Sequence, residues 1–256
     1  MPVALTVAGS DSGGEAGIQA DLKTFAALHV HGASAITCIT AQNRKAVRRL
    51  EPCSPAMVRA QLEAVAAEFP LAAAKTGMLY SEGIVRQVAA FFRRRPRVPL
   101  VVDPVIISTS GRRLLQRAGV KALQRELLPL ATLVTPNVAE AEVLTGKKIA
   151  TLEALRAAAR GIRQSFGCAA LVKGGHLRGT DAAVDFLCSD DGEWLLSVPR
   201  ARGLALHGTG CIYSAAITAW LARGRSLGKS VELAKNHITQ VLYQAASENR
   251  PRPGPH

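Results

Sequence analysis

The sequence has few aromatic residues and no long hydrophobic run. Phe, Trp and Tyr make up 4% of the 256 residues and hydrophobic residues 48%, so the core must be mainly aliphatic. No apolar run approaches the roughly 20 residues that span a membrane. The first residues, MPVALTVAG, lack a basic leader and favour a buried strand over a signal peptide. These absences predict a cytoplasmic protein without a membrane partner, and the length fits one domain over residues 1–256.

The cysteines do not form metal-binding or disulfide patterns. There are five, none of them in a C-x-x-C pair, so the sequence indicates neither a zinc site nor a disulfide framework. Cys38, Cys168 and Cys188 lie in or beside strand-like runs and are expected to be core residues. Cys211 differs, because it follows two glycines in HGTGC at the start of a helical stretch.

Positive charge exceeds negative charge, with 32 Lys and Arg against 19 Asp and Glu. A basic excess can indicate nucleic-acid binding, but here it is spread along the chain. The densest run, FFRRRPR at residues 91–97, lies at an expected helix end, where basic side chains complement free carbonyl groups. A second run, QNRKAVRR at residues 42–49, has no aromatic residue for base stacking. We therefore expect no nucleic-acid partner.

Short apolar runs alternate with helical patterns along most of the chain. This order is typical of a mostly parallel sheet covered by helices on both faces. A late change to two strand-like runs around DDG adds an antiparallel hairpin. Strands are expected in residues 2–9, 33–43, 71–79, 98–105, 131–137 and 168–175, the hairpin in 181–199, and helices in 16–32, 54–69, 81–95, 113–128, 151–165, 210–222 and 229–247.

Polar residues and glycines recur where the expected strands end. The ends read GSDSGG, TAQN, KTGM, DP, TPN and KGGH in chain order. Ligands of open α/β sheets bind beyond the carboxyl ends of the strands, so this recurrence predicts a site there. Neither the P-loop pattern nor G-x-G-x-x-G is present. Asp11 and Ser12 in the first of these loops are either ligand-facing residues or turn formers.

HGTGC predicts an anion-binding turn. A glycine-rich turn at a helix N-terminus leaves backbone N–H groups free, and the helix dipole favours negative charge there. The backbone of Gly208, Thr209, Gly210 and Cys211 could therefore form an anion hole, and the pKa of the Cys211 thiol should be lowered. The structural alternative is a glycine-assisted turn that only caps the helix.

Two acids and a lysine extend this site. Asp103 ends an apolar run and Glu140 follows a strand end, so together they could hold Mg²⁺ through water. As alternatives, they are a turn Asp and a first-turn helix Glu. Lys173 could meet phosphate oxygens or extend from the strand end to solvent, and Met78 could face a flat ring or lie in the core. An anion hole, a lysine and Mg²⁺-binding acids favour phosphoryl transfer.

The motifs also occur together in one known family. In order they are AGSDSGGEAGIQADLKTF, TAQN, AAKTGML, VVDPV, LVTPNVAEAE, LVKGGH and HGTGCIYSAAI. From Val3 to about Ala245 the chain resembles the hydroxymethylpyrimidine/phosphomethylpyrimidine kinases of thiamine biosynthesis, members of the ribokinase-like superfamily. The resemblance implies a ribokinase-like three-layer α/β/α sandwich with a mostly parallel central sheet and a late antiparallel hairpin.

The resemblance also implies roles for individual residues. Cys211 would act as a base toward the substrate hydroxyl or position it. The substrate pocket would be formed by Gly9, Asp21, Gln42 and Met78. The ATP phosphates would be held by Lys173, Asn137 and Thr209, and Mg²⁺ by Asp103 and Glu140. Gly208 and Gly210 would complete the anion hole.

The implied reaction uses ATP and Mg²⁺ in a homodimer. It phosphorylates 4-amino-5-hydroxymethyl-2-methylpyrimidine and then its monophosphate to the diphosphate. A pyridoxal or pyridoxine kinase is the nearest alternative, because that ring is also flat and bears a hydroxymethyl group. A non-catalytic pyrimidine sensor is a third reading of the same pocket.

Overall fold

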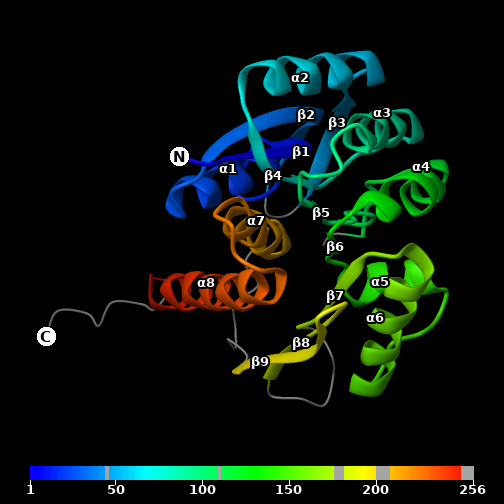
Figure 1. Cartoon of the computed structure of the whole chain (residues 1–256), viewed down its shortest axis with the longest axis vertical. Coiled ribbons are helices and arrows are strands. Elements are labelled where there is room, and N and C mark those ends of the chain that lie inside the picture. Colours follow the sequence, from blue (N-terminus) through cyan, green and yellow to red (C-terminus); the bar gives the residue numbers. More distant parts are fainter. Residues whose placement is uncertain (44–45, 109–110, 176–181, 200–207, 249–256) are drawn as a thin grey trace, which may run out of the picture.

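The computed structural model describes residues 1–43, 46–108, 111–175, 182–199 and 208–248. A single sheet runs through this part of the chain. Nine strands lie in the order β3-β2-β1-β4-β5-β6-β7-β8-β9 (Figure 1). The strands are β1 (Val3–Asp11), β2 (His31–Gln42), β3 (Val47–Pro52), β4 (Leu71–Thr76), β5 (Leu100–Val102), β6 (Leu133–Val134), β7 (Ala169–Gly174), β8 (Ala182–Ser189) and β9 (Gly192–Pro199).

Six neighbouring strands pair in parallel, in the spatial order β2, β1, β4, β5, β6 and β7. Antiparallel strands lie at both edges of the sheet. The β8–β9 hairpin was expected and is confirmed. At the other edge, β3 pairs antiparallel with β2. No strand was predicted there, and the basic run at 42–49 overlaps only its first three residues. After β1 the chain builds β2 on one side and β4 on the other, so the strand order reverses at β1, where α/β sheets form ligand crevices.

Helices cover both faces of the sheet, as expected (Figure 1). One apolar cluster joins the sheet to α2, α3, α4, α5 and α6, and a second joins it to α1, α7 and α8. The helices are α1 (Gly17–Ala27), α2 (Pro55–Glu68), α3 (Glu82–Arg93), α4 (Arg117–Ala122), α5 (Val138–Thr145), α6 (Leu152–Phe166), α7 (Thr209–Ala222) and α8 (Leu227–Glu248).

Local sequence signals set several helix ends. The Ser54 side chain accepts the Met57 N–H at 3.1 Å, and Pro55 opens α2 as predicted. The predicted helix at 113–128 is wrong at both ends. The N–H groups of Leu114 and Leu115 donate to the Ile106 carbonyl instead, so α4 begins only at Arg117. It continues into a π-helical turn (Leu123–Leu127) and a 3₁₀ turn (Leu128–Leu130).

The three cysteines expected in the core are buried, with Cys38, Cys168 and Cys188 at most 5% exposed. Among the described residues, no helix combines the length and the apolar character needed to cross a membrane.

Candidate active site

A cavity of about 490 Å³ opens at the carboxyl ends of the parallel strands. The helices α1, α5 and α7 begin there and contribute residues of their first turns or N-caps to its wall. Every predicted site residue except Asp21 lines it, namely Gly9, Gln42, Met78, Asp103, Asn137, Glu140, Lys173, Gly208, Thr209, Gly210 and Cys211.

The loop from β1 to α1 is organised by Asp11. Its Oδ1 accepts the Gly13 N–H at 2.8 Å, and its Oδ2 accepts the N–H groups of Glu15 and Ala16 at 3.0 and 2.9 Å. The turn-forming alternative for Asp11 is therefore confirmed. Ser12 exchanges hydrogen bonds with the Gln42 backbone at 2.8 and 2.9 Å, which fixes Gln42 at the cavity mouth.

One end of the cavity has an apolar wall that includes Met78 and Leu114. Met78 is buried there, and a Cβ placed on Gly9 would lie 3.4 Å from its Sδ atom. Cys38 and Leu114 pack against Met78 in a small separate cluster. Because Gly9 has no side chain, the space beside the Met78 sulfur stays open, and a planar ring can lie there.

The N-terminus of α7 is held in place by Gly208. This residue has φ +80°, and a Cβ there would lie 1.9 Å from the Glu15 carbonyl oxygen, so only glycine lets the two loops meet. The first hydrogen bond of the helix runs from the Ile212 N–H to the Gly208 carbonyl. The preceding N–H groups of the first turn belong to the positive end of the helix dipole, as the predicted anion hole requires. His207 of the HGTGC motif lies outside the described residues.

Gly208→Ala is expected to lower the midpoint of thermal unfolding strongly, because it adds a backbone collision to an unfavourable φ. Gly224→Ala is the matched control, since Gly224 has φ +76° but no atom within 4 Å of the added Cβ. The control should cost only about 1 kcal/mol, from the conformation alone. Equal melting temperatures for the two variants would contradict the close contact with Glu15.

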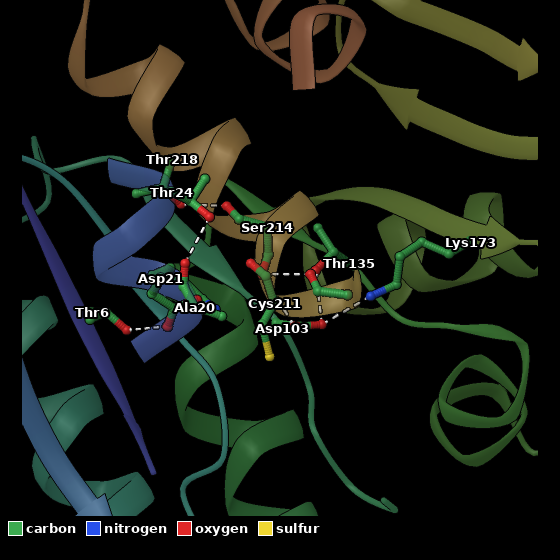
Figure 2. A network of polar contacts seen from close by, with 12 residues as sticks. Thr6, Ala20, Asp21, Thr24, Asp103, Thr135, Lys173, Cys211, Ser214 and Thr218 are labelled. Atoms are coloured by element: carbon green, nitrogen blue, oxygen red, sulfur yellow. Dashed lines mark hydrogen bonds and ion pairs between the residues drawn. The ribbon is translucent and has the colours of Figure 1, made fainter. Parts of the chain in front are cut away.

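Asp103 and Lys173 form a hydrogen-bonded ion pair at the centre of the site (Figure 2). The Lys173 Nζ atom lies 3.1 Å from Asp103 Oδ1, which also accepts the Thr135 hydroxyl at 3.2 Å. Ser214 Oγ lies 3.2 Å from the other carboxylate oxygen, Oδ2. Neither hydroxyl partner was predicted as a site residue. Thr135 could have been found as the polar residue at the end of β6, and Ser214 as one helical turn beyond Cys211.

Glu140 and Asn137 form a capping box at the start of α5. The Glu140 N–H donates to Asn137 Oδ1 and the Asn137 N–H donates to Glu140 Oε2, both at 2.9 Å. The structural alternative for Glu140 is thus confirmed. Glu140 also faces the cavity, and its pKa is raised to about 7. Burial is the main cause and the charge of Asp103 adds to it, while Lys173 acts in the opposite direction. The carboxyl group is therefore poised to gain charge when a cation approaches.

Cys211 does not have the lowered pKa expected of it. Burial raises the pKa of its thiol to about 11, against the opposing effects of Lys75 and of the Gly17 N–H. Desolvation of the thiolate and the charges of Asp21 and Asp103 raise this pKa. Together they outweigh the lowering effect of the helix N-terminus that begins at Gly17. The raised pKa favours the thiol over the thiolate at neutral pH.

Asp21 is not on the cavity wall. It is fully buried, its Oδ1 lies 2.7 Å from Lys75 Nζ, and its Oδ2 accepts the Thr6 hydroxyl at 2.6 Å. Lys75 is also fully buried. A direct contact between Asp21 and a substrate ring does not fit this arrangement, because the carboxylate is already fully engaged beneath the wall.

The donor set suits Mg²⁺ only when phosphates complete it. Among the described residues, no three His, Cys, Asp or Glu side chains gather into a metal cage. Asp103 and Glu140 lie on the same cavity surface, and the charge of Asp103 contributes to the raised pKa of Glu140. Mg²⁺ usually binds one or two carboxylates together with water and substrate phosphates, so these two residues fit it.

Comparisons with known proteins agree with this geometry. Residues 11–253 match the phosphomethylpyrimidine kinase family. A hydroxymethylpyrimidine/phosphomethylpyrimidine kinase from Rhizobium meliloti is 48% identical over 246 residues, 95% of this chain and 91% of that protein. The crystal structure of phosphomethylpyrimidine kinase from Clostridium difficile 630 shares 40% identity and a TM-score of 0.84, covering 94% of this chain and 100% of that one. Pyridoxal kinase from Staphylococcus aureus, in complex with AMP-PCP and pyridoxal, shares 32% identity and a TM-score of 0.85, covering 93% and 87%. The predicted ribokinase-like architecture is confirmed by these neighbours.

Proposed function

The chain belongs to the phosphomethylpyrimidine kinase family, so it is a kinase, and from this premise we propose which hydroxyl and phosphate groups it phosphorylates. The first acceptor is the hydroxymethyl group of 4-amino-5-hydroxymethyl-2-methylpyrimidine. The second is the phosphate of the resulting monophosphate, which gives the diphosphate used in thiamine biosynthesis. Relatives named as kinases of both compounds support this pair of reactions.

One observation carries the proposal: Cys211, Lys173 and the first turn of α7 meet at one point of a cavity that has an apolar wall beside them. A Cβ on Gly210 would lie 3.2 Å from Lys173 Nζ, so the ammonium group stands against the helix N-terminus. The two positive elements can share one transferring phosphoryl group. Met78 and Gln42 then hold the pyrimidine on the opposite side.

ATP fits the remaining length of the cavity. Its phosphates would lie on the first turn of α7 and on Lys173, with Thr209 and Asn137 beside them. Mg²⁺, when bound, would neutralise phosphate charge beside Asp103 and Glu140. The far end of the cavity, between β9 and α8, has an apolar wall that suits a flat base; this wall is formed by Val198, Pro199, Ile238, Leu242 and Tyr243, with Lys235 and Thr239 as polar neighbours.

Cys211 would orient the acceptor group. A thiol with a raised pKa can donate a hydrogen bond or accept one from the substrate hydroxyl, whereas it is a poor base at neutral pH. We therefore favour positioning over proton removal in the resting site. The pair of Lys173 and Asp103 remains as the charged centre of the transfer.

The test offers MgATP with the pyrimidine alcohol, its monophosphate and pyridoxal in separate reactions, each analysed by mass spectrometry. The proposal expects monophosphate from the first and diphosphate from the second, with EDTA as the metal-free control. Phosphate on pyridoxal alone would instead support the second candidate, which the likeness to pyridoxal kinases favours. No transfer to any acceptor would support the pyrimidine sensor. The expected homodimer and cytoplasmic location remain predictions, as does the single domain.

A further inference from the structure

Two segments that are distant in the sequence line the acceptor end of the cavity, where the function proposed above places the pyrimidine. Thr40 and Gln42 lie on this surface at the end of β2, and Ile107 and Ser108 lie on it in the loop between β5 and α4. The way in which these two segments are joined therefore sets the shape of the acceptor end.

The sheet alone holds the end of β2 only at its margin. β3 is an edge strand, and its register with β2 shifts between Ala41 and Gln42, so that Gln42 pairs with Val47, the first residue of β3. Bulges re-aim side chains and often lie beside active sites. Ser12 already holds the Gln42 backbone, which leaves Val47 as the member of this last pair that needs support.

Arg112 supports the Val47 side. Its Nη1 atom donates to the Val47 carbonyl at 2.6 Å, across 65 residues of sequence. The Arg112 backbone is fixed to the other wall segment, because its N–H donates to Ser108 Oγ at 2.9 Å and its carbonyl accepts the Ser108 N–H at 2.8 Å. A charged donor makes a stronger hydrogen bond than a neutral one. One residue thus joins the wall residue Ser108 to the strand partner of the wall residue Gln42.

The stability of the fold gives little reason for this contact. Arg112 is exposed, and β3 is attached to the protein interior through Leu50, which packs against the cluster of Cys38, Met78 and Leu114. An exposed side chain usually contributes little to stability, and fixing a long arginine costs rotamer freedom. What the contact does achieve is to join the two halves of the acceptor wall.

We infer that Arg112 is a positioning residue for the acceptor, whose guanidinium group holds the Val47 carbonyl and thereby fixes the opening between Gln42 and Ser108. The inference rests on the proposed function only in taking this end of the cavity as the acceptor site. Arg112 acts through the two wall segments, whereas the end proposed for the ATP base is built from other elements, β9 and α8.

Steady-state kinetics of Arg112→Met test this role in the active enzyme, with whichever acceptor the substrate test identifies. The KM for the acceptor should rise by about fivefold to tenfold, as expected when one hydrogen bond from a charged group no longer holds the wall. The KM for ATP and kcat should stay within about twofold of the wild type, because losing contacts that bind substrate and transition state equally changes KM alone.

Arg113→Met is the matched control, because it removes the same charge from the next residue of the same loop. The Arg113 backbone pairs with Ile107, but its side chain has no hydrogen bond or ion pair within the described ranges. This variant should leave both KM values unchanged. An equal rise in the acceptor KM of both variants would assign the effect to positive charge at the cavity mouth and not to the contact with Val47.

Hydrogen–deuterium exchange of the full-length, ligand-free protein tests the same contact without a substrate. In Arg112→Met the amides of β3 should exchange about fivefold faster, because the end of the β2–β3 ladder opens more often. β9, the edge strand on the opposite side of the sheet, is the internal reference and should be unchanged. The melting temperature should change little, since Arg112 is exposed.

The inference is overturned if β3 of Arg112→Met exchanges as in the wild type, if the KM for ATP rises as much as the KM for the acceptor, or if Arg113→Met has the same effects. A lower melting temperature with faster exchange throughout the sheet, β9 included, would also overturn it, because Arg112 would then have a purely structural role. The exchange experiment needs neither ATP nor a pyrimidine, so its result does not depend on whether the proposed acceptors are correct.

Discussion

Lys173→Met is expected to lower kcat for phosphoryl transfer by about a hundredfold to a thousandfold, the usual effect of removing one donor aimed at developing charge. The ammonium group lies against the first turn of α7 and pairs with Asp103 at 3.1 Å. Charge on the transferring group is largest in the transition state, so kcat should fall more than the affinity for ATP. Steady-state kinetics with the pyrimidine alcohol give both quantities.

Two further variants define what Lys173 contributes. Lys173→Arg keeps the charge but has a larger head group. The space beside the ammonium group is narrow, because even a Cβ added to Gly210 would lie 3.2 Å from Lys173 Nζ. The Arg variant should therefore recover only part of kcat. Lys148→Met removes a 92% exposed lysine that pairs with Glu142, and should change neither kcat nor stability. A Lys173→Met enzyme within twofold of the wild type would remove this residue from the transfer.

The sequence could predict the layers and most of the site because these features depend on local patterns. Alternating strands and helices were enough for the α/β/α order. Polar residues at strand ends, together with the glycine turn that begins α7, were enough to bring Asp103, Lys173 and Cys211 to one cavity. The strand β3 escaped because VRRLEP shows no burial pattern of its own and is a strand only through its pairing with β2.

Errors within the site have one physical origin, which is desolvation. Asp21 was expected at the substrate, but Lys75, 54 residues away in sequence, pairs with it beneath the wall. The thiol of Cys211 was expected to ionise readily at a helix N-terminus, but burial among carboxylates outweighs that effect. Both outcomes depend on groups that only the tertiary structure brings near, so spacing in the sequence could not reveal them.

Glu140→Gln is expected to stabilise the free protein at alkaline pH and to reduce its activity. The folded state raises the pKa of Glu140 from 4.5 to about 7, so between these values the folded protein holds a proton that the unfolded chain has lost. Stability contributed by Glu140 is therefore complete below pH 4.5 and is lost as pH rises through 7. At 1.36 kcal/mol for each pKa unit, the loss is roughly 3 kcal/mol at most above that pH.

Glutamine avoids this cost and keeps the capping box, because Gln serves as well as Glu at this position of a helix. Thermal unfolding should show a variant that is several degrees more stable than the wild type at pH 8.5, at about 2 to 4 °C for each kcal/mol, and equal to it at pH 4. Without the carboxylate, one Mg²⁺ partner is missing, so kcat should fall as stability rises.

Glu142→Gln, two residues along the same helix, is the control of opposite sign. The Ile149 N–H and Lys148 lower the pKa of Glu142, so its stabilising effect is present above pH 4.5 and is lost as pH falls. That variant should be slightly less stable than the wild type at pH 8.5, with normal turnover. The raised pKa of Glu140 is contradicted if Glu140→Gln is less stable than the wild type at pH 8.5. It is also contradicted if the difference in stability does not vary with pH. If Glu140→Gln is more stable and inactive, the site holds Glu140 in a costly state, and bound Mg²⁺ would return part of that cost as binding energy for the nucleotide.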